Sequence, residues 1–474
     1  MRLFKNFSMY SIGRILVDGL KFFLIPMYTA YIPIAEYGLY TLLVSIKDIL
    51  FNLPAVISTS SYSRFFFKDK EKSFLPSLVS LFMLGFSILA ILTLLLSGVL
   101  RRLLFESFPQ YHYLIFVALG IAFFQFFIKI RKHEAIMRSK AHEFLIISLL
   151  TGLVPLLLII FLVVHQGMTI DGLFLGLFLP FIILAVFIFL TRYRLILRKP
   201  DTSLMKKYFS YGFPLAFREI STKILKAGDR FVIHAFIGTT AVGAYSFVYL
   251  ITSALRLFLI QPFGHAIHPI IMRNEENKKV LQKTITNASV AIMASVSIFS
   301  IIFSFFIEHF LVLFVRDESY LQYTPLIYLL SVAFVIISAK GLTQKGLSLA
   351  NKTHIIMWIT IIAAIVNIVL NIIMIPAIGV WGAALATIIS HLLMLILFVH
   401  YSEKHYHIRY PKARMAIIIS AYSVIIASFF MLQGLFYDVV LKSVLVVVYL
   451  ALLWFFRILT KKNIEYVIKT IRKA

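Results

Sequence analysis

Long apolar runs, each about 20 residues in length, alternate with short polar segments along this chain of 474 residues. Runs of this length match a helix that crosses a bilayer, whereas a transmembrane β-barrel would show shorter segments that alternate with period two. The pattern therefore predicts an all-α polytopic membrane protein with about 14 transmembrane helices. The predicted spans are 8–31, 37–58, 75–99, 113–130, 143–164, 172–191, 208–235, 241–263, 286–307, 324–343, 355–375, 381–400, 415–432 and 439–457.

Positive charge is distributed unevenly between alternate connecting segments. If the N-terminus lies inside, nearly all Lys and Arg outside the spans fall on the inner side, and the outer side holds only Arg101, Arg102, Arg316 and, at the outer end of the last span, Lys442. The positive-inside rule then places both termini in the cytoplasm. The same asymmetry explains the net charge of +26, so we do not expect nucleic acid as a partner.

Composition supports a membrane protein and excludes several kinds of chemistry. The chain is 61% hydrophobic and only 14% charged, against roughly 25% charged residues in soluble domains. It has no cysteine, no metal-ligand spacing and no phosphate-binding GxxxxGK[ST] loop. We therefore predict no catalytic residue, no metal and no cofactor, and we interpret the apolar N-terminal stretch as a retained first helix.

The chain repeats itself. The segment Ile32–Tyr40 recurs as Ile237–Tyr245, and Lys140-Ala141-His142 recurs as Lys352-Thr353-His354. Six predicted spans separate the copies, so both copies keep the same orientation and are related by an axis along the membrane normal. We expect a six-helix lobe over 1–200, a second over 205–400, and two extra helices with a basic cytoplasmic tail over 401–474.

Ionisable residues inside the predicted spans are the strongest functional signal. They include the cations Arg14, Lys21, Lys47, Arg218, Lys223, Lys226, Arg230, Arg256 and Lys340, and the acids Asp18, Asp48, Glu219 and Asp229. A cation at mid-bilayer costs at least about 3 kcal/mol, so such residues usually face a wet cavity or a partner. The excess of cations over acids predicts a hydrated cavity for an anion.

Two predicted helices carry their charges on one face. The stripes are Arg14, Asp18 and Lys21 on the first helix, and Glu219, Lys223, Lys226 and Arg230 on the seventh. Each set has the spacing of a single helical face, and the two helices are related by the repeat. The simpler alternative is that Arg14 pairs with Asp18, and Glu219 with Lys223, only to support packing.

Several motifs resemble one family. They are Pro26-Met27-Tyr28, Glu36-Tyr37-Gly38-Leu39-Tyr40, Tyr211-Gly212-Phe213-Pro214, Asp229-Arg230, Val242–Ser246, Ala350–Thr353, Asn367, Asn371, Pro376, Gly379 and Gly382-Ala383-Ala384. Together they resemble the Wzx-type polysaccharide flippases of the multidrug/oligosaccharidyl-lipid/polysaccharide exporter superfamily. The resemblance covers the chain to about residue 400 and implies a multi-pass protein of the bacterial cytoplasmic membrane.

The resemblance also implies a substrate, namely an oligosaccharide linked through pyrophosphate to a polyprenyl lipid. This lipid would be flipped from the inner to the outer leaflet by alternating access. Candidate anion contacts are Arg14, Lys21, Arg218, Lys223, Lys226 and Arg256. Asp18, Asp48 and Glu219 are candidate counter-charges or sites for a coupling proton or sodium ion, and Asp229 with Arg230 is a candidate gate pair. A polymerase or ligase of the same pathway is a further candidate partner.

Three alternatives remain open at this point. A drug or cation exporter of the same superfamily would be expected to line its cavity with acids, contrary to the excess of cations. A lipid-linked glycan polymerase or ligase usually has a large outer loop, whereas the outer loops predicted here have about 15 residues or fewer. A flippase for a peptidoglycan or teichoic-acid precursor differs only in its headgroup, which the sequence does not identify.

Overall fold

The computed structural model describes residues 19, 22–69, 73–273, 277–406, 408–432 and 438–458. All regular elements within these ranges are helices. The chain forms two compact units, Met1–Ala244 and Tyr245–Ala474. The predicted all-α architecture is therefore confirmed, and the two units are described separately below.

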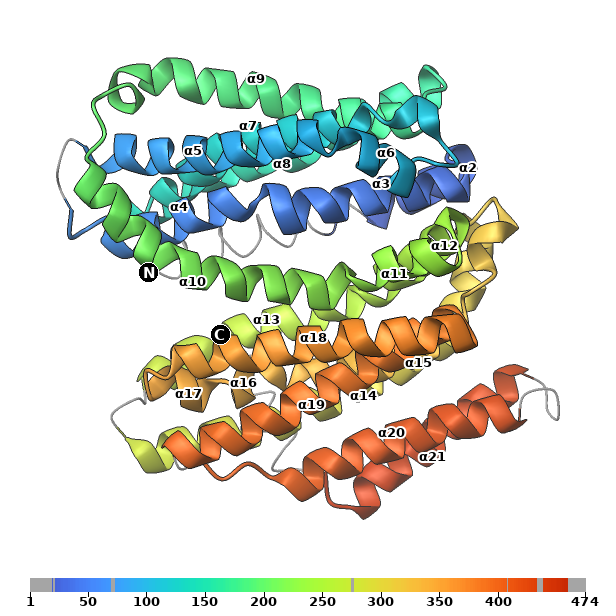
Figure 1. Cartoon of the computed structure of the whole chain (residues 1–474). Coiled ribbons are helices and arrows are strands. Elements are labelled where there is room, and N and C mark those ends of the chain that lie inside the picture. Colours follow the sequence, from blue (N-terminus) through green and yellow to red (C-terminus); the bar gives the residue numbers. More distant parts are fainter. Residues whose placement is uncertain are drawn as a thin grey trace. The chain divides into compact units, whose positions relative to one another are not determined.

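The first unit is a bundle of long helices joined by short turns (Figure 1). Its α-helices are α2 (Ile25–Tyr31), α3 (Ile34–Ile46), α4 (Leu53–Phe65), α5 (Phe74–Leu95), α6 (Ser97–Leu104), α7 (Leu114–Met137), α8 (Ala141–Ile160), α9 (Ile170–Ile196), α10 (Thr202–Ala227), α11 (Asp229–Phe236) and the start of α12 (Thr239–Thr252). Two π-helical turns, η1 (Lys47–Phe51) and η3 (Phe161–His165), and a 3-10 turn, η2 (Pro109–Tyr111), interrupt them.

The core of the first unit lies where α7, α8 and α9 run alongside one another and α5 packs against α9. Phe82 of α5 stacks face to face on Phe126 of α7 with ring centroids 3.6 Å apart. Helix α10 packs along α4, and a Cβ added to Gly212 would lie only 2.9 Å from the Cα of Ile57. The glycine of the Tyr211–Pro214 motif therefore permits close contact of two backbones.

The second unit contains the remaining helices. They are α13 (Gln261–Arg273), α14 (Lys278–Phe314), α15 (Leu326–Ser338), α16 (Lys340–Thr343), α17 (Lys345–Leu349), α18 (Thr353–Ile378), α19 (Val380–Tyr406), α20 (Lys412–Leu432) and α21 (Asp438–Phe455), with the turns η4 (Arg256–Ile260) and η5 (Glu318–Leu321). Helices α18 and α19 form a tight hairpin through Gly379, whose φ of 64° favours glycine.

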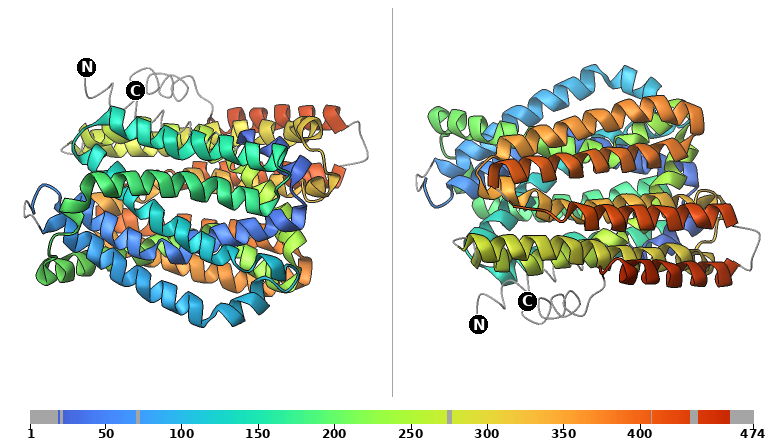
Figure 2. Two further views of the ribbon diagram at one scale, coloured as in Figure 1. Left: turned by 90° about the horizontal axis from the view of Figure 1, so that it is seen from above. Right: turned by 90° about the horizontal axis from the view of Figure 1, so that it is seen from below.

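The last two helices, α20 and α21, run side by side, as the right-hand view of Figure 2 shows. They join the core of the second unit through polar as well as apolar groups. The hydroxyl of Tyr422 lies 3.0 Å from Oγ of Ser300 and 2.7 Å from Oγ of Ser331. Lys442, which the charge pattern assigned to an outer segment, lies within α21 with only 1% of its side chain exposed.

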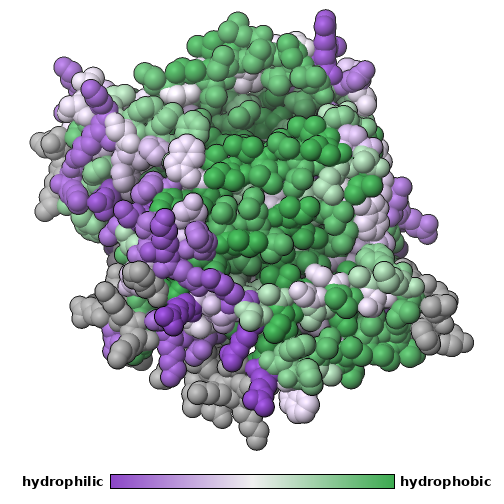
Figure 3. All heavy atoms as spheres, turned by 60° about the horizontal axis from the view of Figure 1, so that its bottom comes forward, coloured by the Kyte–Doolittle hydropathy of each residue, from purple (hydrophilic) through white to green (hydrophobic). Residues whose placement is uncertain are grey.

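Within the described ranges, 11 helices are long and apolar enough to cross a membrane, and a bent pair brings the number up to 12. The first predicted span, 8–31, lies largely outside these ranges, and α10, which carries six charged side chains, is not among these helices. The number 14 is therefore not confirmed and stays a prediction. Apolar side chains cover most of the face shown in Figure 3, as expected of a multi-pass membrane protein.

Candidate anion-binding site

The candidate site forms at a break in one helix of the first unit. Helix α3 with its π-helical continuation η1, and helix α4, belong to one predicted span, but their axes differ by 51° across Asn52. Pro54 follows at the start of α4, where it lacks an N–H and its ring clashes with the preceding turn. A proline next to a π-helical turn accounts for the bend, and such turns occur frequently at functional sites.

Three polar side chains meet at this bend. The ammonium of Lys47 donates to Oδ1 of Asp48 over 2.9 Å, and Nδ2 of Asn52 donates to the same oxygen over 3.2 Å. The backbone oxygen of Lys47 accepts from Asn52 twice, from the side-chain amide over 3.0 Å and from the backbone N–H over 3.1 Å. The bend and its polar network therefore stabilise each other.

Two further lysines reach the bend from other helices. Nζ of Lys129, on α7, lies 2.5 Å from Oδ1 of Asn52. Nζ of Lys223, on α10, lies 2.7 Å from the backbone oxygen of Asp48. We call Lys47, Asp48, Asn52, Lys129 and Lys223 the bend cluster.

The bend cluster has more positive than negative charge. It holds three ammonium groups and one carboxylate, and Lys129 also interacts electrostatically with the carboxylate of Glu219. Among the described residues, Lys129 and Lys223 donate to neutral oxygens and are not paired directly with a carboxylate. The six residues together therefore carry a net charge of +1.

The bend cluster has a buried side and a side that is open to solvent. Asn52 is 1% exposed, and the side chain of Lys47 is 9% exposed. The side chain of Asp48, by contrast, is 46% exposed, and Lys129 and Lys223 are half-buried. An ammonium has three N–H donors, so these lysines can bind an anion from the open side.

The predicted gate pair is adjacent, but its contacts differ from a simple ion pair. The backbone N–H of Arg230 donates to Oδ1 of Asp229 over 2.9 Å, and Asp229 is only 3% exposed. Nη1 of Arg230 lies 3.2 Å from Oγ of Ser45, on α3. Arg230 therefore links α11 to α3, and a gating role stays a prediction.

Of the other predicted site residues of the first unit, some lie outside the described residues and some lie on the same helix as Lys223. Arg14, Asp18 and Lys21 lie outside the described residues. Arg218, Glu219 and Lys226 are half-buried on α10, the helix that also supplies Lys223.

Arg256 belongs to the second unit, where it begins the π-helical turn η4 after α12. Lys47 begins the π-helical turn η1 after α3, the helix that the repeat relates to α12. A proline follows each turn, Pro54 in the first unit and Pro262 in the second. Both units thus place a cation at the first position of a π-helical turn.

Three members of the bend cluster, Lys47, Asn52 and Lys129, were not among the predicted site residues, although Lys47 was one of the cations inside the predicted spans. Lys129 stands at the end of the predicted span 113–130, where a lysine is typical of a membrane boundary. A signal was present, because Asn52-Leu53-Pro54 interrupts the apolar pattern in the middle of span 37–58. That Lys129 reaches this interruption depends on the packing of α7 against η1, which the sequence does not show.

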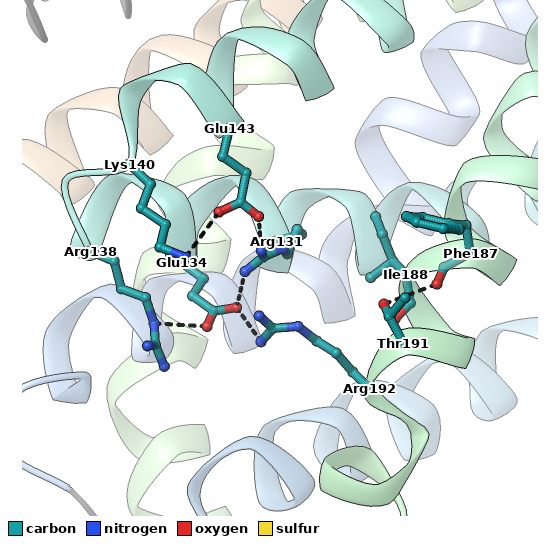
Figure 4. Close-up of polar contacts among 9 residues, drawn as sticks. All are labelled: Arg131, Glu134, Arg138, Lys140, Glu143, Phe187, Ile188, Thr191 and Arg192. Atoms are coloured by element: carbon teal, nitrogen blue, oxygen red, sulfur yellow. Dashed lines mark hydrogen bonds and ion pairs between the residues drawn. The ribbon is translucent and has the colours of Figure 1, made fainter.

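A second charged cluster joins α7, α8 and α9 (Figure 4). Glu134 is only 4% exposed and accepts from Arg131, Arg138 and Arg192 over 2.8, 2.9 and 2.5 Å. Arg131 also pairs with Glu143, at the start of α8. Because Glu134 is enclosed by its own arginines, this cluster links three helices and leaves its carboxylate closed to a ligand.

Among the described residues, no group of three His, Cys, Asp or Glu is placed so that it could hold a metal ion. The ionisable chemistry of the bend cluster is that of ammonium groups, which bind phosphate and carboxylate as point charges. The geometry therefore favours an anionic ligand.

Comparison with protein families gives two matches. The model of the family described as polysaccharide biosynthesis protein matches residues 3–275, and the MatE model matches residues 214–373. The chain is 22% identical to the probable low-salt glycan biosynthesis flippase Agl15 of Haloferax volcanii over 222 residues. This aligned region covers 46% of each protein. It is 24% identical over 203 residues to the uncharacterized membrane protein MJ1068 of Methanocaldococcus jannaschii, or 42% of this chain and 40% of the relative. The chain thus spans less than half the length of these curated relatives.

Solved structures share the fold over a much larger part of the chain. Lipid II flippase MurJ, in an inward closed conformation, superimposes with a TM-score of 0.68 at 15% identity and covers 95% of this chain and 99% of its own. An inward-facing multidrug resistance MATE family transporter of the MOP superfamily gives a TM-score of 0.59 at 14% identity, over 85% of this chain and 98% of its own. At such identities the similarity establishes the fold alone, which is that of the MOP superfamily.

Proposed function

Because this chain belongs to the polysaccharide biosynthesis protein family, we propose that it flips a polyprenyl-pyrophosphate-linked oligosaccharide from the inner to the outer leaflet of a membrane. The observation that carries this proposal is the bend cluster, in which Lys129 and Lys223, as far as the described residues go, donate to neutral oxygens and form no direct ion pair with a carboxylate. The similarity to a probable glycan biosynthesis flippase supports the same class of substrate.

The chemistry of the substrate fits the bend cluster. A pyrophosphate diester carries two negative charges, and lysines bind phosphate oxygens as point charges. Two unit charges about 4 Å apart gain about 1 kcal/mol in water but roughly 4 kcal/mol at an effective dielectric constant of about 20. A partly buried cluster with a net positive charge therefore binds a pyrophosphate much better than a solvated surface would.

The main alternative is a drug or cation exporter, since MATE transporters share the fold. A cation would meet three ammonium groups at the bend, and the carboxylate of the bend cluster, Asp48, is already paired with Lys47 at 2.9 Å. The sign of the charge thus favours the flippase. A peptidoglycan or teichoic-acid precursor carries the same kind of phosphate linkage and remains a candidate substrate.

The remaining parts of the proposal follow from the sequence and the family. We place the protein in the bacterial cytoplasmic membrane with both termini in the cytoplasm, and we assign it transport by alternating access without a catalytic step. A proton or a sodium ion at Asp48 or Glu219 is the proposed coupling ion. A polymerase or ligase that consumes the flipped lipid is the proposed partner.

Lipid analysis of cells that lack the protein tests the proposal. We expect a polyprenyl-pyrophosphate oligosaccharide to accumulate, and its mass will identify the glycan. Restoring the unchanged gene should clear the lipid, whereas Lys223→Ala should not. If no such lipid accumulates and the cells become sensitive to cationic drugs instead, the exporter alternative replaces the flippase.

A further inference from the structure

Asn52 is the most buried member of the bend cluster, with 1% exposure. Its amide nitrogen donates to the backbone oxygen of Lys47 and to Oδ1 of Asp48, and its amide oxygen accepts from Lys129. A carboxamide presents one acceptor and two donors in a fixed plane, and each faces a complementary group here. The side chain therefore contacts an ammonium and a carboxylate while contributing no charge of its own.

This neutrality determines the charge of the site. An aspartate at the same position would place a carboxylate beside the ammonium of Lys129, at the 2.5 Å contact that the amide oxygen now makes. The net charge of the bend cluster with Glu219 would fall from +1 to zero. An alanine would keep the charge but would release Lys129 from its anchor, because the amide oxygen is the acceptor that fixes the ammonium.

We propose that Asn52 is a positioning residue that holds Lys129 at the anion site with its charge uncompensated, so that the site prefers a diphosphate to a monophosphate. The proposal rests on the function proposed above and specifies which residue sets its anion selectivity. Coulomb attraction grows with the charge of the ligand, so each uncompensated ammonium benefits the diphosphate more. Lys129 reaches the phosphate only when Asn52 directs it.

Equilibrium titration of the purified full chain in lipid nanodiscs, with inorganic pyrophosphate and inorganic phosphate as probes, tests this. For the unchanged chain we expect pyrophosphate to bind at least about tenfold more tightly than phosphate. Asn52→Asp should weaken pyrophosphate binding by about tenfold and phosphate binding by only about threefold. Asn277→Asp, which adds the same charge at the N-cap of α14, is the matched control and should change neither.

A double-mutant cycle separates positioning from a merely structural role. Asn52→Ala and Lys129→Gln should each weaken pyrophosphate binding by a similar factor, and the double variant should lose no more than either alone. The cycle also decides the matter if Asn52→Asp does not fold. A loss from Asn52→Ala that persists in full when Lys129 is already Gln would overturn the proposal, as would unchanged pyrophosphate binding by folded Asn52→Asp.

The same titration distinguishes the two proposals. If the unchanged chain and Lys129→Gln bind pyrophosphate equally weakly, the anion site and the proposed function both fail. If Lys129→Gln loses affinity but the Asn52 variants do not, only the role of Asn52 is wrong.

Discussion

Gly38 and Gly243 lie backbone against backbone within the first unit. A Cβ on Gly38 would lie 2.9 Å from the nitrogen of Gly243, and one on Gly243 would lie 3.0 Å from the carbonyl carbon of Ile34. The two glycines occupy the same position in the two copies of the repeated segment, Ile32–Tyr40 and Ile237–Tyr245. Each copy therefore packs on the other through a glycine at the same position of the repeat.

Gly38→Ala should destabilise the protein by about 2 kcal/mol, because the added methyl group would overlap the backbone oxygen of Thr239. Gly243→Ala should cost a similar amount for the reciprocal reason. Thermal unfolding of the purified variants in detergent measures both. Gly98→Ala is the control, since nothing lies within 4 Å of its added Cβ, and a loss at Gly98 equal to that at Gly38 would contradict the explanation.

Glu134→Gln should destabilise the first unit by about 3 kcal/mol. The substitution leaves three arginines around a buried neutral amide, and removing one partner of a buried ion pair is far more costly than removing both. Glu106→Gln, on an exposed connection, removes the same charge and should have little effect. Equal unfolding temperatures for the two variants would show that the cluster in Figure 4 contributes nothing to stability.

The ion pairs of Lys442 predict that removing the lysine costs less stability than removing its two carboxylate partners. Its ammonium lies 3.3 Å from Glu308 and 2.6 Å from Asp438, yet Lys442 is 1% exposed while the two carboxylates are 30% and 48% exposed. Lys442→Met removes the buried charge and leaves acids that water can reach, so stability should change by less than about 1 kcal/mol.

The double change Glu308→Gln with Asp438→Asn instead leaves the buried ammonium without a carboxylate, and it should cost about 3 kcal/mol. Chemical unfolding of both variants measures the difference. A Lys442→Met variant that is less stable than the double variant would contradict this account.

The fold class could be predicted from the sequence because the length of apolar runs and the distribution of positive charge indicate transmembrane helices without any knowledge of tertiary packing. The helices of the structure coincide with most predicted spans, and the motif residues acquire physical roles. Glu36, for example, accepts a hydrogen bond from the backbone N–H of Ile170 at the start of α9 and one from Tyr111. This glutamate of the repeated motif therefore fixes connections at the ends of three helices.

The candidate site was predicted only in part, because its geometry depends on a bend and on packing between distant segments. Lys223 and Asp48 were predicted from their place inside apolar spans. In the structure, Nζ of Lys223 lies 2.7 Å from the backbone oxygen of Asp48. Lys129 was missed because a lysine at the end of a span ordinarily marks the membrane boundary. Asn52 was missed because a single neutral residue carries no charge signal, although it organises the bend cluster.

Flipping in proteoliposomes tests the central claim most directly. A purified polyprenyl-pyrophosphate oligosaccharide with a fluorescent label would be followed as it becomes accessible to a membrane-impermeant quencher. Lys129→Ala and Lys223→Ala should each slow flipping by about tenfold or more, since each removes an ammonium from the bend cluster. Arg101→Ala, on the exposed surface of α6, should flip at the rate of the unchanged chain. Flipping by folded Lys129→Ala and Lys223→Ala at that same rate would contradict the claim that the bend cluster binds the pyrophosphate.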